Sequence, residues 1–242
     1  MTTLSSSSDR LLQTLQLVAA SPQPLSAKDM ARRLALPPST LYRQLTHLSQ
    51  WGLLQAGEDG AYHAGPLGLQ LAMGFQQHNT LAAQARPEMQ RLARLSNETV
   101  ALMVATRQQV ICIEMMESQQ ALRCAFAAGK GQPLARGASA LALLAFMPAA
   151  QSQASLDSML PPEEHETLRQ TLAEVRRQGY ATSDSAIDPG IWGVSAPLLQ
   201  GRRKLLGALT LMAPSGRAQR RAQLVEQTRQ AARKISAYLG CD

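Results

Sequence analysis

Three helix-forming segments separated by proline-containing breaks occupy the first 52 residues, and this pattern limits the fold more than any other feature of the chain. Residues 9–20 repeat leucine and valine at intervals of three and four, and the Ser-Pro-Gln-Pro run at 21–24 ends that helix. A second helix begins after Ser26, a suitable N-cap. Leu-Pro-Pro at 36–38 then leads into a third helix, capped by Ser39 or the residue before it. Two helices joined by such a short turn predict a helix-turn-helix.

A hairpin follows the third helix. Two short alternating runs, at 53–56 and 61–63, flank the sequence Gly57-Glu58-Asp59-Gly60, which has the composition of a hairpin turn. Three helices and a hairpin within about 55 residues predict a winged helix-turn-helix. We therefore expect residues 1–65 to form a first, DNA-binding domain.

Polar and basic side chains on the third helix and the hairpin have the chemistry of a DNA-contacting surface. Arg43 suits guanine, and Gln44 suits adenine unless its side chain faces the domain. Hydroxyls and free N–H groups of the first turn suit phosphate oxygens. The alternative is a three-helix packing module that binds a protein. The candidate DNA-contacting residues are Ser39, Thr40, Tyr42, Arg43, Gln44, His47, Tyr62 and His63.

The positive net charge does not locate this surface. Residues 1–200 hold 15 basic and 15 acidic residues, whereas residues 201–242 hold 9 basic and 2 acidic residues. Residues 1–75 hold five basic and four acidic residues, so counterion release alone would give weak DNA binding. We interpret the basic C-terminal segment as a solvated helical face, and we expect DNA affinity to depend on dimerisation and hydrogen bonds.

An apolar helix and a longer α/β-like region follow the hairpin. Residues 66–80 are expected to form a linker containing a helix at 66–77, whose Leu69, Ala72, Met73 and Phe75 are available to a partner chain. Residues 81–242 alternate helical and strand-like patterns, which indicates an α+β domain with a mixed antiparallel sheet flanked by helices. The expected helices are 81–96, 138–146, 161–178 and 217–239; the expected strands are 99–105, 109–115, 122–126, 180–185, 193–198 and 205–212, with a turn at 129–133.

Catalytic and metal-binding patterns are absent from the sequence. The four histidines lie in no HExxH motif, and the chain has no Walker A lysine, GxGxxG or nucleophile elbow. Cys112, Cys124 and Cys241 have no CxxC spacing, which is unlike a zinc cage or a disulfide framework. We expect no catalytic site, no metal and no cofactor, and a cytoplasmic protein without a signal peptide or membrane span. An enzyme with a winged-helix appendage is the rival interpretation.

Two stretches resemble IclR-type bacterial transcriptional regulators. In the N-terminal half these are LSAKDMARRLALPPSTLYRQLTHLSQWGLLQ and YHAGPLGLQLAMG. In the C-terminal half they are LRCAFAAGKGQPLARGASALALLA and EVRRQGYATSDSAIDPGIWGVSAPLLQGRRKLLGALTLMAPSGR. The resemblance runs from about residue 10 to residue 239, and the GYA…G…APL…GALT pattern makes it specific.

The resemblance implies a linker helix and, at 81–242, a GAF/PAS-like α/β effector-binding and oligomerisation domain. It also implies a homodimer or a dimer of dimers on double-stranded operator DNA, and a small-molecule effector such as an organic or aromatic acid. The implied effector-binding positions are Met115, Ser118, Gln132, Pro133, Ser183, Ile191, Gly193, Thr210 and Met212.

The chain departs from the family pattern around this implied pocket. The family commonly has His-Ala-Thr-Ala-x-Gly-Lys where this chain has Ala-Arg-Gly-Ala-Ser-Ala-Leu at 135–141. Gly193 stands where cysteine is frequent, and Ser183 where an acidic residue is frequent. An anionic effector would therefore need backbone N–H groups or an arginine such as Arg123 or Arg136. A DNA-binding regulator whose pocket is degenerate remains the second interpretation.

Overall fold

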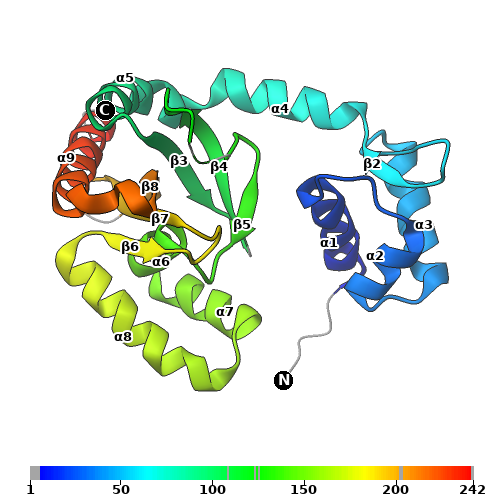
Figure 1. Ribbon diagram of the computed structural model, residues 1–242. Helices are drawn as coiled ribbons and strands as arrows, with labels where there is room; N and C mark the ends of the chain where they lie inside the picture. The colour runs from blue at the N-terminus through cyan, green and yellow to red at the C-terminus, as the bar shows by residue number, and fades with distance from the viewer. Residues whose placement is uncertain (1–5, 108, 123, 125, 202–203, 241–242) are drawn as a thin grey trace. The chain divides into compact units, whose positions relative to one another are not determined.

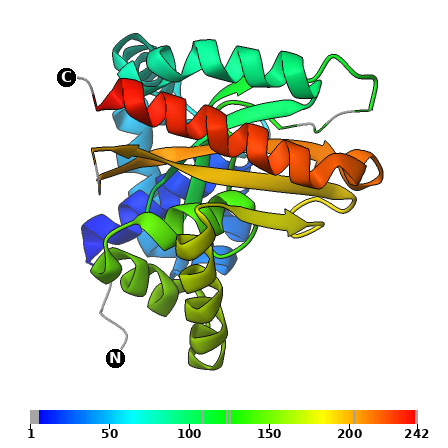
Figure 2. The same ribbon diagram turned by 90° about the vertical axis from the view of Figure 1, so that its left-hand side faces the viewer.

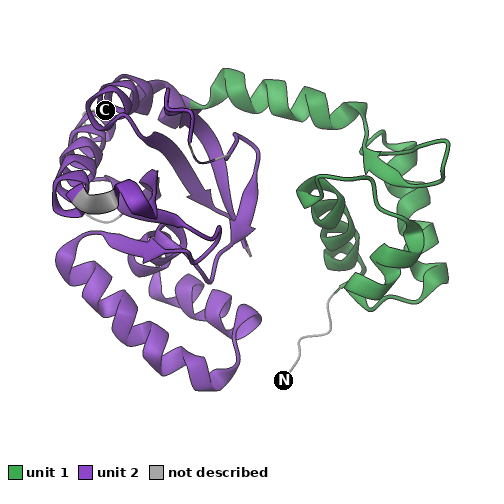
Figure 3. Cartoon of the chain, in the orientation of Figure 1, with its two compact units in different colours: residues 1–79 green, residues 80–242 purple. Residues whose placement is uncertain are grey.

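The computed structural model describes residues 6–240 except 108, 123, 125, 202 and 203. The chain divides into two compact units, Met1–Asn79 and Thr80–Asp242 (Figure 3). Each unit has its own hydrophobic core, so each is described by itself. Among the described helices, none is both long enough and apolar enough to cross a membrane.

Three helices form the core of the first unit: α1 (Ser7–Ala20), α2 (Ala27–Leu34) and α3 (Pro38–Gln50) (Figure 1). Met30, Leu41 and Leu45 have no exposed surface, because the apolar positions of α2 and α3 face each other and α1. Ser26 caps α2 as expected, since its Oγ accepts a hydrogen bond from the Asp29 N–H. The expected cap at Ser39 is wrong: α3 begins at Pro38 without a side-chain cap, and proline at this position has no N–H to satisfy.

The wing consists of β1 (Leu54–Ala56) and β2 (Tyr62–Ala64), which pair in antiparallel register. Tyr62 exchanges two backbone hydrogen bonds with Leu25 at 2.8 and 2.9 Å, which fastens the wing to the start of the helix-turn-helix. These contacts complete a winged helix-turn-helix, as the sequence predicts.

Helix α4 (Pro66–His78) begins directly after the wing. The Leu67 N–H donates to the Gly52 carbonyl at 3.0 Å, and a Cβ at Gly65 would lie 2.3 Å from that carbonyl oxygen, so only glycine fits there. No described residue of α4 is buried in the chain, and Leu69, Leu71, Met73 and Phe75 are 52–66% exposed. The helix therefore displays an unusually apolar surface.

The second unit is built on one six-stranded sheet in the order β5-β4-β3-β8-β7-β6. Every pairing between neighbouring strands is antiparallel. The two edge strands, β5 and β6, are the shortest, with three and four residues. In spatial order the strands are β5 (Gly131–Pro133), β4 (Gln109–Met116), β3 (Thr99–Ala105), β8 (Lys204–Pro214), β7 (Ile191–Gln200) and β6 (Ala181–Asp184).

Helices cover both faces of this sheet (Figures 1 and 2). Alternation along β3 sends Val100 and Leu102 into one core and Ala101 and Met103 into the other. The first core contains residues of α5 (Thr80–Ser96) and α9 (Arg221–Leu239). The second contains residues of α6 (Ala138–Phe146), α7 (Ala149–Met159) and α8 (Pro162–Gln178). A 3₁₀ helix, η1 (Ser215–Arg220), joins β8 to α9.

Two local expectations for this unit are wrong, and one helix lies where none is predicted. Leu122, Cys124 and Phe126 lie outside any strand, whereas a strand was expected at 122–126. The expected turn at 129–133 contains the edge strand β5. Helix α7 was not expected, because its sequence, AAQSQASLDSM, has no clear apolar stripe.

Candidate functional site

The exposed face of α3 carries most of the candidate DNA-contacting residues. Ser39, Tyr42, Arg43 and His47 are exposed, and Thr40 is half-buried at the first turn. Leu41, Leu45 and Leu48 occupy the opposite, buried face. The polar face of α3 is therefore free to enter a major groove, which is the geometry a recognition helix needs.

Gln44 does not belong to this exposed set. Its side chain is only 5% exposed, and the Thr14 hydroxyl donates to its Oε1 at 2.7 Å. A base contact from Gln44 would require breaking this buried hydrogen bond between α1 and α3. The expectation that Gln44 reads adenine is corrected accordingly: the residue positions α3 in the domain.

The wing exposes fewer side chains suited to contacting DNA than the sequence predicts. Tyr62 is half-buried against the first unit's core, and the His63 ring Nδ1 lies 3.0 Å from the Ala64 carbonyl oxygen. The wing tip carries two exposed carboxylates, Glu58 and Asp59, and Asp59 Oδ1 accepts from the Ala61 N–H. Two negative charges at this tip oppose close approach to phosphates.

The second unit contains a small, partly enclosed cavity of about 40 Å³ between the sheet, the start of α6 and two covering segments. Strands β7 and β8 form its floor, and β6 contributes from one side. The structure brings six of the nine implied effector-binding residues together here: Gln132, Ser183, Ile191, Gly193, Thr210 and Met212.

Hydroxyl and amide groups line this cavity at hydrogen-bonding distance from one another. Thr210 Oγ1 lies 2.9 Å from Ser195 Oγ, and the Gln132 amide donates to Ser139 Oγ at 2.8 Å. The Ala138 N–H, in the first turn of α6, donates to Ser183 Oγ at 3.0 Å. The N-terminus of α6 thus opens onto the cavity, with Gly137 as an N-cap that has no side chain.

Three implied effector-binding residues lie elsewhere. Met115 is half-buried against the core of the α6 face, and Pro133 is exposed on the edge strand β5. Ser118 is buried, but its hydroxyl donates to the Asn97 carbonyl at 2.8 Å. None of these three residues lines the cavity.

Among the described residues, no arginine lines the cavity. Arg136 lines a separate hollow with Glu163 and Glu164 on α8, and Arg123 lies outside the described residues. Among the described residues that line the cavity, the only charged side chain is that of Asp188. Backbone N–H groups and hydroxyls are therefore the donors available to a ligand.

Sequence reasoning missed the residues that close the cavity. Phe126 comes from the segment expected to be a strand, and Ala186, Ile187 and Asp188 come from the loop between β6 and β7. Gly137 has φ +87, and a Cβ there would lie 3.0 Å from Ile187 Cγ1. The Asp188-Pro-Gly190 turn was the one local signal that such a loop exists.

The described cysteines have the properties of buried structural thiols. Burial is the main cause that raises the pKa of Cys112 to about 11, and Cys112 Sγ donates to the Glu114 carbonyl at 3.3 Å. Burial also raises the pKa of Cys124 to about 11. Both thiols are protonated at neutral pH and are poor nucleophiles. Among the described residues, no group of three histidine, cysteine or carboxylate side chains could hold a metal ion.

Four of the nine basic residues at 201–242 form ion pairs within the second unit. Arg217 pairs with Glu98, Arg221 with Asp184, Arg229 with Glu226 and Lys234 with Glu88.

A winged helix-turn-helix joined to an α/β domain with a small, partly enclosed cavity is the architecture of a DNA-binding regulator. A family model described as the IclR helix-turn-helix domain matches residues 7–57, and one described as the bacterial transcriptional regulator IclR C-terminal domain matches residues 74–237. The chain belongs to the IclR family of bacterial transcriptional regulators. It is a regulator rather than an enzyme.

Named relatives agree with this assignment. The chain is 26% identical over 238 residues to the HTH-type transcriptional regulator BhcR of Paracoccus denitrificans, covering 94% of this chain and 85% of that protein. The C-terminal domain of a transcriptional regulator from Vibrio cholerae is 40% identical, with a TM-score of 0.59, over 65% of this chain and 96% of that one. An IclR homologue from Microbacterium hydrocarbonoxydans, solved with 4-hydroxybenzoate, is 26% identical, with a TM-score of 0.71, over 98% of this chain and 100% of that one.

Proposed function

We propose that this regulator binds operator DNA through α3 as a dimer and senses a small organic acid in the cavity of its second unit. The observation that carries the proposal is the hydrogen-bond inventory of the cavity. It holds more buried donors than the described residues satisfy, and a carboxylate is the ligand that accepts from several donors at once.

Buried hydroxyls and the first-turn N–H groups of α6 supply these donors. Thr210 and Ser195 are 4% and 0% exposed and share one hydrogen bond, which leaves one hydroxyl hydrogen over. Ser139 is 3% exposed and accepts from Gln132, and its own hydrogen has no acceptor among the described residues. The first-turn N–H groups of α6 lack intrahelical acceptors and carry the positive end of the helix dipole. Together these groups favour an anionic acceptor at the mouth of α6.

Cavity size indicates which acid fits without rearrangement. A water molecule needs roughly 10–15 Å³ on this measure, so about 40 Å³ accommodates a ligand of only a few heavy atoms. Short organic acids fit this limit. An aromatic acid such as the 4-hydroxybenzoate bound to the Microbacterium homologue would require Ile187 and its loop to move outwards.

Exposure of α4 supports the dimer. Burial of its large apolar side chains against a second copy would remove apolar surface from water and stabilise a dimer. These side chains are Leu69, Leu71, Met73 and Phe75. A dimer places two recognition helices on one face of the DNA, which compensates for the nearly neutral charge of residues 1–75. Such a protein acts on bacterial DNA in the cytoplasm, with effector binding changing operator affinity by shifting the population of conformations.

A thermal-shift screen against short organic acids, aromatic acids and sugar acids tests this proposal. A ligand at 100 times its Kd should stabilise the folded protein by about 2.7 kcal/mol. Operator binding is then measured with and without each stabilising acid. Stabilisation together with altered DNA affinity supports the proposal, whereas DNA binding that no acid changes favours a regulator with a degenerate pocket.

A further inference from the structure

The two segments that cover the cavity are both fastened to one short element. Phe126 belongs to the segment at 118–126, and Ile187 and Asp188 belong to the loop at 185–190. These segments are about 60 residues apart in the sequence, as their numbering shows. The first is hydrogen-bonded to η1 through Leu122, and the second through Gly190. Asp184, directly before the second segment, is hydrogen-bonded to η1 and to the first residue of α9.

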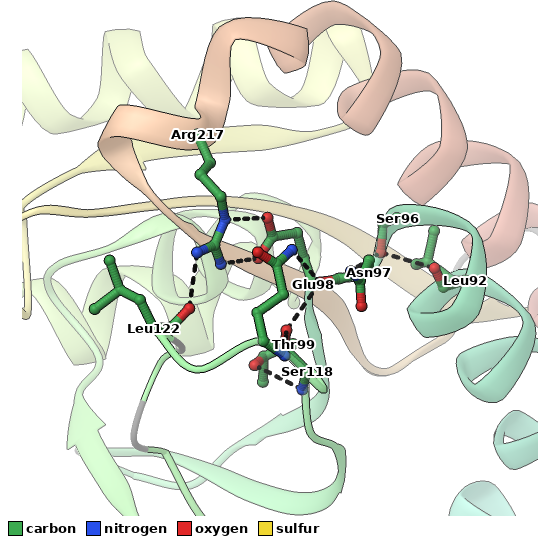
Figure 4. A network of polar contacts seen from close by, with 9 residues as sticks. Leu92, Ser96, Asn97, Glu98, Thr99, Ser118, Leu122 and Arg217 are labelled. Atoms are coloured by element: carbon green, nitrogen blue, oxygen red, sulfur yellow. Dashed lines mark hydrogen bonds and ion pairs between the residues drawn. The ribbon is translucent and has the colours of Figure 1, made fainter.

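Arg217 in η1 holds the first covering segment (Figure 4). Its Nε and Nη2 donate to the two carboxylate oxygens of Glu98 at 3.0 and 2.9 Å, and its Nη1 donates to the Leu122 carbonyl at 2.8 Å. The Glu98 side chain is only 6% exposed. Such a bidentate pair fixes the guanidinium plane, so its remaining donor fixes the position of Leu122.

A second fastening point lies earlier in the same segment. Asn97, which has φ +56, presents its carbonyl to the Ser118 hydroxyl at 2.8 Å and to the Gln120 amide at 3.1 Å. Ser118 and Gln120 are therefore held to the turn between α5 and β3, and Leu122 is held to η1. Phe126, which lines the cavity, follows these residues in the chain.

Ser215 and Arg221 hold the other covering segment. Ser215 Oγ and Arg221 Nη2 each donate to the Asp184 carboxylate at 2.6 Å, and the Ser215 N–H donates to the Gly190 carbonyl at 2.8 Å. Asp184 and Gly190 stand at the two ends of the loop that carries Ile187 and Asp188. These hydrogen bonds lower the pKa of Asp184, so its carboxylate stays ionised near neutral pH.

The thiol of Cys124, in the first covering segment, is affected by charges of both signs. After burial, the carboxylates of Glu98 and Asp188 are the next causes that raise the pKa of Cys124. The Arg217 guanidinium opposes them.

We propose that η1 is a shared anchor that couples the two covering segments of the cavity, with Arg217 as the positioning residue. Displacing either segment must disturb η1, and η1 leads directly into α9, which packs on α5 in the core of the opposite sheet face. A bound effector would displace the covering segments and so use this coupling, and this part of the proposal rests on the proposed function. The coupling itself is a property of the unliganded second unit.

Hydrogen exchange on the full chain tests the coupling without a ligand. Arg217→Gln should accelerate exchange at the amides of Ser118 and Gln120, in the segment that Arg217 holds. It should also accelerate exchange, at least fivefold, at Ser185, Gly190 and Ile191, whose amides are hydrogen-bonded within the other segment. Ser215→Ala should have the reciprocal effect on Ser118 and Gln120. The matched control is Arg177→Gln, which removes an exposed arginine–glutamate pair on α8.

If each variant accelerates amide exchange only in the segment whose hydrogen bond it removes, the proposal of a shared anchor is contradicted. Equal acceleration across β3 and β8 would also overturn it, since that reflects a lower global stability. Arg217→Lys keeps the charge opposite Glu98 but loses the bidentate geometry, so it should give a smaller effect at the same amides. Binding of pyruvate and 4-hydroxybenzoate is measured on the same samples. Retained coupling without binding of any acid contradicts the proposed function alone.

Discussion

The two units use polar side chains in opposite ways. On α3 the polar groups are exposed, so they keep their contacts with water and do not lower the stability of the fold. In the cavity they are buried and only partly satisfied, as with Ser139 and Thr210. A buried donor hydrogen without an acceptor costs about 1–3 kcal/mol. Under the proposed function, the contacts to DNA lie on an exposed surface, whereas the contacts to a ligand would come from buried groups of the core.

Core truncation gives the largest expected difference between the units. Leu45→Ala removes a fully buried side chain from the first unit and should lower its stability by about 2–5 kcal/mol. Operator binding should weaken while ligand stabilisation of the second unit persists. Leu172→Ala, on α8, is the reciprocal control. If calorimetry shows a single transition lowered equally by both substitutions, the units do not unfold separately.

Arg43→Ala should give the next largest effect, on DNA alone. Loss of a base-edge contact should cost about 1–3 kcal/mol in operator affinity, measured by fluorescence anisotropy at fixed salt. Arg43→Lys should recover little, because lysine lacks the bidentate geometry. Unchanged affinity in the alanine variant would show that Arg43 makes no base-edge contact.

Thr210→Val tests the buried donors of the cavity with almost no change in shape. The substitution should weaken effector binding about three- to tenfold, or roughly 0.5–1.5 kcal/mol, with apo DNA binding unchanged. Thr228→Val is the matched control, because Thr228 is fully buried on α9 and bonds only the Leu224 carbonyl. Equal effector affinities for Thr210→Val and wild type in calorimetry would make Thr210 purely structural.

The smallest effect is expected at the wing tip. Glu58→Gln removes one exposed negative charge and should raise operator affinity by less than about 1 kcal/mol, with the gain fading as salt increases. Glu163→Gln in the second unit should have no such effect. A decrease in affinity for Glu58→Gln would mean that this carboxylate accepts a hydrogen bond from a base.

How far the sequence predicts the molecule differs between the units for a physical reason. Helices α1 to α3 and the wing follow from local periodicity, caps and turn residues, so their existence and the exposed face of α3 were predictable. The orientation of Gln44 was not, because its partner Thr14 is 30 residues away. In the second unit the strands were mostly predictable, whereas the cavity depends on Phe126 and Ile187, whose positions over the sheet no local pattern indicates.

The most direct test of the account is operator affinity of the full chain, measured with and without the acid that most stabilises it, using DNA from upstream of its own gene. We expect the acid to change operator affinity at least fivefold in wild type and in Glu163→Gln. We expect a smaller change in Thr210→Val at the same acid concentration. An acid that stabilises the second unit yet leaves operator affinity identical in all three proteins would contradict the claim that this cavity controls DNA binding.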